Sequence, residues 1–401
     1  MGLNETTSGE RLHISFFGMR NAGKSSVVNA VTGQEMSIVS DTLGTTTDPV
    51  RKTMELLPLG PVVIIDTPGI DDEGELGEKR VKRANDILAK TDIAVVVIDA
   101  IRGKTEQDTE LIKLIEEKRL PYIVAFNKCD SIAKREKLGY NELYVSAKTG
   151  ENITELKNML AHISRDAKSD KRIIGDMLKE GDIVVLVMPI DESAPKGRII
   201  LPQVQTMRDI LDSHCSFVGC QVEELKSVLD SLAKKPKLVI TDSQAFGSVS
   251  KIVPKDILLT SFSILLARYK GDLERLVRGA GKLSKLTNNS KVLISEGCTH
   301  HRQCNDIGSK KMPDWIRNFS GVEPVFEFTS GGGFKDDLTE YDLIVHCGGC
   351  MLNEKEMLSR MEKAEKAGVE IVNYGIAIAN MHGILERSLE IFPDLLNKLK
   401  N

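Results

Sequence analysis

The loop Gly18-Met-Arg-Asn-Ala-Gly23-Lys24-Ser25 constrains the fold more than any other feature of the chain. It follows a short apolar run at residues 13–17 and leads into a helical pattern. A glycine-rich loop between a strand and a helix turns backbone N–H groups toward phosphate, and the helix N-terminus favours the same anion. The sequence therefore predicts a P-loop. The residues expected to bind phosphate or its metal here are Gly18, Asn21, Ala22, Gly23, Lys24, Ser25 and Ser26.

Two further segments supply groups for hydrolysis. Asp66-Thr-Pro-Gly69 ends an apolar run at residues 62–66, where the carboxylate can hold Mg²⁺ through water and the Gly69 N–H can meet the γ-phosphate. The Gly44-Thr-Thr-Thr-Asp48 segment offers a threonine to Mg²⁺ and the γ-phosphate, with Thr46 favoured and Thr45 the alternative. The residues expected to carry hydrolysis are Lys24, whose ammonium reaches the β and γ phosphates, Ser25 as a Mg²⁺ ligand, and Thr46, Asp66 and Gly69.

The base is expected to lie against Asn127-Lys-Cys-Asp130, which ends the apolar run at residues 122–127. The Asp130 carboxylate can accept hydrogen bonds from N1 and the exocyclic amino group of guanine, whereas an adenine edge would leave it unpaired. Ser146-Ala-Lys148 closes the pocket. The expected base-pocket residues are Asn127, Lys128, Asp130, Ser146, Ala147 and Lys148. These five motifs follow one another along the chain at residues 18–25, 44–48, 66–69, 127–130 and 146–148. Together they predict GTP binding and hydrolysis.

Residues 11–165 resemble the small GTPases of the TrmE/Era group. The resemblance implies that Asn21 coordinates a potassium ion beside the phosphates and that potassium stimulates hydrolysis. Ile70 follows Gly69, where Ras-like proteins have a glutamine that orients water. An apolar side chain cannot orient that water, so we expect slow intrinsic turnover.

Six of the seven cysteines lie in the C-terminal half, a clustering that predicts metal or redox chemistry in a cytosolic chain. Cys298-Thr-His300 and His346-Cys347-Gly-Gly-Cys350 each follow an apolar run. The carboxyl ends of parallel strands meet at one edge of a sheet, so these soft ligands can converge. Thiolates bind zinc or iron-sulfur clusters, and the spacing of these residues is compatible with either.

The whole chain resembles the HydF family of FeFe-hydrogenase maturation GTPases, through the potassium-type GTPase, the two cysteine motifs and the segment from Pro189 to Leu211. The resemblance implies a 4Fe-4S cluster on Cys298, Cys347 and Cys350 with an exchangeable fourth position. His300 and His346 are candidates for that position or for hydrogen bonds to the ligands. It also implies a homodimer that is loaded with a diiron precursor by radical-SAM maturases and delivers this precursor to apo FeFe-hydrogenase.

We expect an α/β protein of three domains. A P-loop GTPase domain at residues 1–168 is followed by a small α/β dimerisation domain at 169–262 and an α/β metal-cluster domain at 263–401, with a charged linker near residues 165–172. Apolar runs predict strands at residues 13–17, 62–66, 93–99, 122–127, 143–146, 183–188, 238–241, 292–295, 325–328, 343–346 and 370–373.

The chain carries 54 Lys and Arg against 58 Asp and Glu, for a net charge of −4. This balance gives no electrostatic reason to expect a nucleic-acid or membrane partner. No targeting segment is evident at the N-terminus, and we expect a cytoplasmic protein. The alternative function is a ribosome- or RNA-associated TrmE/Era-like GTPase with a structural zinc held by three cysteines and a histidine.

Overall fold

The computed structural model describes residues 8–34, 50–67, 84–166, 171–190, 199–297, 307–331 and 333–400. The chain divides into two compact units, which we name the N-terminal unit (residues 6–170) and the C-terminal unit (residues 171–401). Within the described residues, no helix is both long and apolar enough to cross a bilayer.

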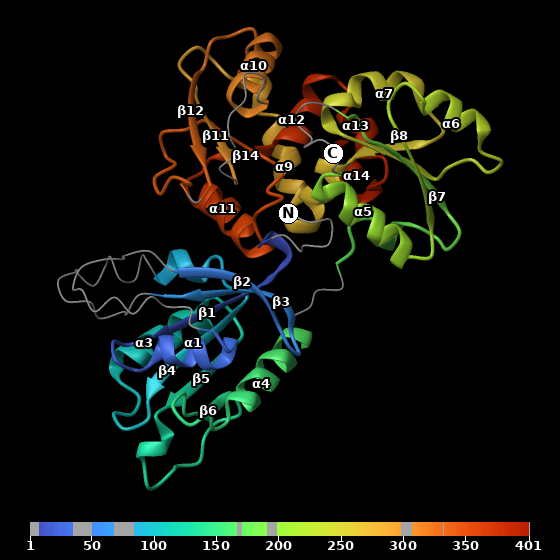
Figure 1. Ribbon diagram of the computed structural model, residues 1–401. Helices are drawn as coiled ribbons and strands as arrows, with labels where there is room; N and C mark the ends of the chain where they lie inside the picture. The colour runs from blue at the N-terminus through green and yellow to red at the C-terminus, as the bar shows by residue number, and fades with distance from the viewer. Residues whose placement is uncertain are drawn as a thin grey trace. The chain divides into compact units, whose positions relative to one another are not determined.

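The N-terminal unit is built on one six-stranded sheet with the order β2-β3-β1-β4-β5-β6 (Figure 1). All neighbouring strands are parallel except β2, which runs antiparallel to β3. The sheet is therefore mixed, with β2 antiparallel at its edge. The elements are β1 (Leu12–Gly18), α1 (Lys24–Thr32), β2 (Val50–Leu56), β3 (Gly60–Asp66), β4 (Ile93–Asp99), α3 (Glu106–Glu117), β5 (Tyr122–Asn127), β6 (Glu142–Tyr144) and α4 (Ile153–Asp166).

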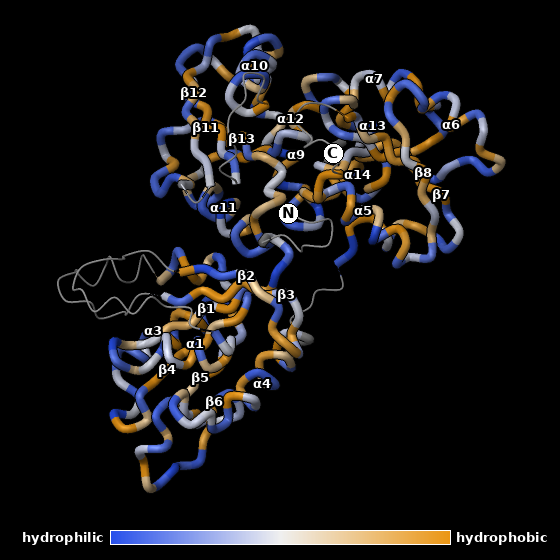
Figure 2. Tube along the Cα trace, viewed as in Figure 1, coloured by the Kyte–Doolittle hydropathy of each residue, from blue (hydrophilic) through white to orange (hydrophobic). Residues whose placement is uncertain are grey.

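Helices cover both faces of this sheet, which explains why its central strands are apolar throughout. In β4, Val95 and Val97 belong to the core under α1 and α4, whereas Val96 and Ile98 belong to the core under α3. Successive side chains of a strand point to opposite faces, so a strand covered on both faces needs an unbroken apolar run. Figure 2 shows these hydrophobic stretches along the central strands.

The C-terminal unit contains two four-stranded parallel sheets, ordered β10-β9-β7-β8 and β12-β11-β13-β14. Its first half comprises β7 (Ile183–Val187), α5 (Leu201–Asp212), β8 (Ser216–Cys220), α6 (Leu225–Ser231), β9 (Leu238–Thr241), α7 (Phe246–Ile252), β10 (Leu258–Ser261) and α8 (Phe262–Lys270). Its second half comprises α9 (Leu273–Ala280), β11 (Lys291–Glu296), α10 (Met312–Ser320), β12 (Val325–Ser330), β13 (Leu343–His346), α11 (Glu354–Lys366), β14 (Glu370–Asn373), α12 (Tyr374–Met381), α13 (Leu385–Ser388) and α14 (Pro393–Lys400).

The two sheets of the C-terminal unit share one hydrophobic core. Phe246 and Phe262 from the first half belong to the same buried cluster as Ile376 and Ile378 from the second. Polar contacts add to this core: Arg387 donates to the carbonyls of Ser250 at 2.7 Å, Val253 at 2.6 Å and Pro254 at 3.0 Å. The predicted boundary between residues 262 and 263 falls at the start of α8, inside this unit. The three-domain division stays a prediction.

The predicted α/β class is confirmed, and each predicted strand coincides with or overlaps an observed one. Three strands were not predicted: β2, β8 and β10. All three lie at sheet edges, and the side chains of β2 and β8 are incompletely buried, whereas those of β10 are mostly buried. The helix expected after the P-loop is α1, which begins at Lys24.

Candidate functional site

The P-loop joins the end of β1 to the start of α1, as the sequence predicted. Gly23 precedes α1 with a φ of 80°, in the left-handed region that favours glycine. A Cβ at Gly23 would lie 2.3 Å from Nδ2 of Asn127. The loop can therefore approach the end of β5 only because this position has no side chain, and the amides of the first turn of α1 face the space where an anion would bind.

Three predicted residues meet at the end of β3. The Ser25 hydroxyl donates to Oδ2 of Asp66 at 2.8 Å, and Nζ of Lys24 lies 3.6 Å from Oδ1. Oδ1 of Asp66 is buried, and the described residues give it no hydrogen bond. A buried carboxylate oxygen without a hydrogen-bond donor is a suitable group for a hydrated cation. The donor set of Ser25 and Asp66 thus fits Mg²⁺ beside a nucleotide.

Asn127 connects the P-loop to the base pocket. This side chain is 2% exposed, and its Nδ2 donates to the carbonyl of Ala22 at 3.0 Å while its Oδ1 accepts from the N–H of Ala147 at 3.0 Å. Lys128 adds a second connection, because its Nζ donates to the Asn21 carbonyl and to Oδ2 of Asp99, both at 2.6 Å. The phosphate and base segments are therefore held in one rigid arrangement.

The carboxylate expected to read the base is fixed by hydrogen bonds. Ser146 donates its hydroxyl to Oδ1 of Asp130 at 2.7 Å, and this bond holds the pKa of Asp130 below its usual value. Arg135 forms a bidentate ion pair with Glu151, with its two terminal nitrogens 2.6 and 3.1 Å from the carboxylate oxygens. It also donates to the Cys129 carbonyl at 3.3 Å, so the segment before Asp130 is held in place. Cys129, between Lys128 and Asp130, is fully buried.

Some predicted residues lie outside the described residues. These are Thr45, Thr46, Gly69, Cys298 and His300. Their roles stay predictions. Lys148 and Ser26 lie within the described residues, beside the base pocket and in α1 respectively, and their contacts with nucleotide are also predictions.

The second cysteine motif follows β13, next to β11 in the sheet. We name residues 347–352 the cysteine loop. The Cys347 N–H donates to the Ser295 carbonyl at 2.9 Å, which continues the strand pairing. Its Sγ accepts from the Gly297 N–H at 3.1 Å and from the Gly349 N–H at 3.4 Å. Gly297 directly precedes Cys298 in the sequence, so the end of β11 that leads into the first motif touches the sulfur of the second.

Backbone N–H groups around a sulfur are typical of thiolate sites that hold a metal. Burial raises the pKa of Cys347 to about 11, and the two N–H bonds oppose this rise. Burial also raises the pKa of Cys350, while Lys270 lowers it. Both residues are free thiols. A metal ion would displace their protons, because the thiolate is the form that binds metal.

Gly349 permits the turn between the two thiols. Its φ is 63°, and a Cβ there would lie 2.5 Å from Sδ of Met357 on α11. A side chain would be strained by the backbone and would collide with the helix. The glycine therefore allows the cysteine loop to bend close to α11.

His346 has both ring nitrogens engaged. Nδ1 lies 2.7 Å from the Cys347 carbonyl, and since a carbonyl only accepts, Nδ1 carries the proton. Nε2 then accepts from Arg360 at 3.0 Å. Burial, with Arg360 adding to it, lowers the pKa of His346 to about 4. In this arrangement His346 orients the backbone of Cys347, and a role as the fourth ligand would require it to leave Arg360.

Two buried cations beside the cysteine loop were not predicted. Arg360 and Lys270 are each 3% exposed. Arg360 reaches His346 from α11, and Lys270 reaches the loop from the end of α8. Among the described residues, no group of three or more His, Cys, Asp or Glu side chains is placed to hold a metal ion. A three-cysteine site therefore depends on Cys298.

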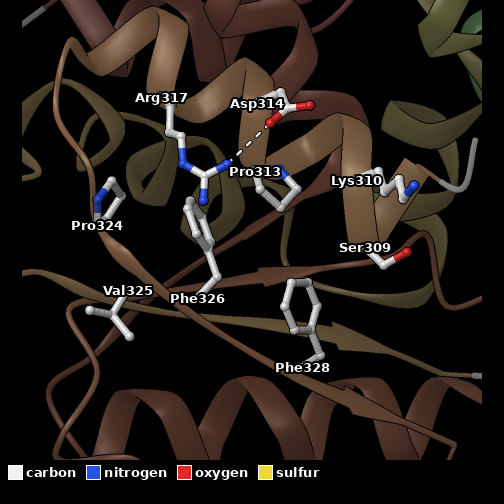
Figure 3. Close-up of a pocket in the computed structure, with 9 residues that line it drawn as sticks. All are labelled: Ser309, Lys310, Pro313, Asp314, Arg317, Pro324, Val325, Phe326 and Phe328. Atoms are coloured by element: carbon white, nitrogen blue, oxygen red, sulfur yellow. Dashed lines mark hydrogen bonds and ion pairs between the residues drawn. The ribbon is translucent and has the colours of Figure 1, made fainter.

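A separate pocket of about 550 Å³ lies between α10 and β12. Figure 3 shows Phe326 and Phe328 of β12 facing Pro313 and Arg317. Arg317 is already engaged, in an ion pair with Asp314 at 3.1 Å and over the ring of Phe326 at 5.1 Å. None of the predicted nucleotide or metal residues lines this pocket.

Comparison with protein-family models gives three matches along the chain. Residues 13–128 match the 50S ribosome-binding GTPase model, residues 173–271 the hydrogen maturase F dimerization domain, and residues 274–391 the hydrogen maturase F tetramerization domain. The two hydrogen maturase F models together span more than half of the chain. The chain belongs to the hydrogen maturase F family. Its N-terminal unit is a P-loop GTPase domain, and the predicted family is confirmed.

Curated relatives share the GTPase region. The tRNA modification GTPase MnmE of Legionella pneumophila (strain Paris) is 36% identical over 157 residues, which are 38% of this chain and 35% of that protein. GTPase Der of Acetivibrio thermocellus is 31% identical over 196 residues, 43% of this chain and 44% of that protein. The chain thus spans about a third to under a half of these relatives' lengths.

Among solved structures, the chain matches that of a point variant of Aquifex aeolicus Era bound to GDP and AlF4⁻. It is 21% identical, covers 57% of this chain and 91% of that chain, and has a TM-score of 0.34. The probable GTP-binding protein engB is 26% identical and covers 38% of this chain and 99% of that chain, with a TM-score of 0.31.

Proposed function

We propose that this chain is a GTP-hydrolysing scaffold that binds a 4Fe-4S cluster and carries the diiron precursor of the FeFe-hydrogenase active site. The observation that carries the metal part is the environment of Cys347, whose sulfur accepts two backbone N–H groups where β11 and β13 end side by side. Membership of the hydrogen maturase F family supports the hydrogenase part. GTP and Mg²⁺ fit the P-loop domain.

In this proposal Cys298, Cys347 and Cys350 hold the cluster, which would supply an anionic metal centre with one exchangeable position. The diiron precursor is cargo. Radical-SAM maturases load it onto this chain, and the chain passes it to apo FeFe-hydrogenase. The chain works as an oligomer, and the names of the two matching domain models support this. The γ-phosphate would order the segment that contains Thr45 and Thr46, as nucleotide switches do.

Metal analysis tests the cluster directly. After anaerobic reconstitution with iron and sulfide, we expect about four iron and four sulfide per chain and an EPR signal on reduction. One zinc per chain without sulfide would overturn the cluster proposal and favour the alternative of an RNA-associated GTPase with a structural zinc site. In that event binding to RNA and ribosomes is the next measurement.

Potassium dependence tests the proposed role of Asn21. Replacing potassium with sodium is expected to slow GTP hydrolysis by about fivefold or more, because a cation beside the phosphates would stabilise the transition-state charge that an arginine finger stabilises elsewhere. The measurement is phosphate release at constant ionic strength. Asn21→Ala should hydrolyse GTP slowly in both salts. A wild-type rate that is equal in the two salts would remove the potassium role.

A further inference from the structure

Two side chains beside the cysteine loop are unusual in their burial. Lys270 and Arg360 are each 3% exposed, although lysine and arginine are rarely fully buried without a specific partner. The partners of Arg360 are clear: Oε1 of Glu356 at 2.8 Å, the Gly331 carbonyl at 2.8 Å and Nε2 of His346. Arg360 therefore has a carboxylate within its own helix to balance its charge.

Lys270 makes a different set of contacts. Its Nζ donates to the Cys350 carbonyl at 3.2 Å and to the Leu352 carbonyl at 3.0 Å. Both acceptors belong to the cysteine loop, at Cys350 itself and two residues after it. An ammonium group has three donors and no acceptor, so it can hold two carbonyls of one loop at once. Lys270 thus fixes the path of the backbone directly after Cys350.

The position of Lys270 in the fold brings it to this loop from a distant part of the sequence. It is the last residue of α8, 80 residues before Cys350. The next residue, Gly271, lies against the side chain of Met361 on α11. The packing of α8 against α11 therefore brings a buried ammonium group to the backbone of the cysteine loop.

We propose that Lys270 is a positioning residue of the metal site, whose buried ammonium group holds the cysteine loop in place and stabilises the negative charge of a thiolate-bound cluster. The inference rests on the proposed cluster binding. Each thiolate ligand adds negative charge, and one-electron reduction of the cluster adds more. A cation in a buried setting acts on that charge with little screening by water, so it stabilises the bound cluster and favours its reduced form.

Two variants separate the two effects of Lys270. Lys270→Met removes both the charge and the hydrogen bonds, whereas Lys270→Gln removes the charge and keeps an N–H donor for the loop. In the full-length reconstituted protein, titrated with dithionite and followed by EPR, both variants should show a reduction equilibrium constant lowered by about tenfold, which is about 59 mV for one electron. Iron loss to a chelator should be faster by about tenfold in Lys270→Met and by less in Lys270→Gln.

A readout on the metal-free protein tests the positioning role without the cluster. Hydrogen exchange of the amides at residues 350–353 should be faster in Lys270→Met than in wild type and close to wild type in Lys270→Gln. Lys251→Gln makes the same charge change at an exposed position of α7, and it should leave potential, iron loss and exchange unchanged.

The outcomes separate this inference from the proposed function. Wild-type protein that takes up no cluster would overturn both. If the wild-type protein binds the cluster, and the Lys270 variants have the wild-type reduction potential and the wild-type rate of iron loss, only the role of Lys270 is overturned. If Lys270→Met does not fold, Lys270→Gln decides the charge effect alone, and a wild-type potential in that variant would count against the proposal.

Discussion

Replacing Lys24 with alanine is expected to lower the rate of GTP hydrolysis by about 100-fold or more, because the variant loses a fixed cation next to the phosphates. Lys24 lies at the first position of α1, and its Nζ is 3.6 Å from Asp66, whose other oxygen accepts from Ser25. The same three side chains would face Mg²⁺ and the γ-phosphate. The measurement is phosphate release under saturating GTP.

The matched control for this variant is Lys113→Ala. Lys113 is exposed on α3, so its removal changes the net charge equally and should leave the rate unchanged. Iron and sulfide content should stay at the wild-type level in Lys24→Ala, because the cysteine loop belongs to the other compact unit. Loss of both GTP hydrolysis and iron and sulfide content in Lys24→Ala would show that the units do not fold independently. A rate near that of wild type would refute the assignment of the P-loop lysine.

Replacing Cys347 with alanine is expected to remove the cluster. Iron should fall from about four atoms per chain to below about one, since a cluster with two remaining cysteines loses the thiolate that the Gly297 and Gly349 amides support. The rate of GTP hydrolysis should match that of wild type. The measurements are iron and sulfide analysis and the visible spectrum after reconstitution.

Cys220→Ala is the matched control for the thiol. Cys220 is a free, partly buried cysteine at the end of β8 in the same unit, and its pKa is raised by burial to about 11. Its replacement should leave iron content unchanged. Full iron content in Cys347→Ala, or equal loss in both variants, would contradict the assignment of Cys347 as a ligand.

The sequence was most informative where burial on both sides of a strand forces a continuous apolar run. The strands β4, β5, β9, β13 and β14 occupy the predicted residues. The strand β2 could not be predicted in this way, because its Val-Arg-Lys-Thr-Met-Glu-Leu sequence is largely solvent-exposed at the edge of the sheet. The strands β8 (Ser-Phe-Val-Gly-Cys) and β10 (Leu-Leu-Thr-Ser) each contain only two consecutive apolar residues, so neither forms a continuous apolar run within the strand.

In the candidate sites, residues that are contiguous in sequence could be predicted, whereas residues that only tertiary packing brings together could not. The P-loop and the cysteine motifs are contiguous in sequence, so their spacing alone indicated phosphate and metal binding. Lys270 and Arg360 resemble ordinary basic residues near helix ends or on amphipathic helices, and only tertiary packing brings them to the cysteine loop. The orientation of His346 was likewise open, since it depends on a hydrogen bond from α11.

The single core of the C-terminal unit restricts how this chain can diverge between species. Phe246 and Phe262 are buried with residues of α12, and Lys270 from α8 bonds the loop that follows Cys350. A recombination event that transferred only the segment after residue 262 would carry Lys270 along with the cysteine loop, but it would separate α12 from Phe246 and Phe262 and leave an apolar surface uncovered. We therefore expect the two halves of the C-terminal unit to be exchanged only together.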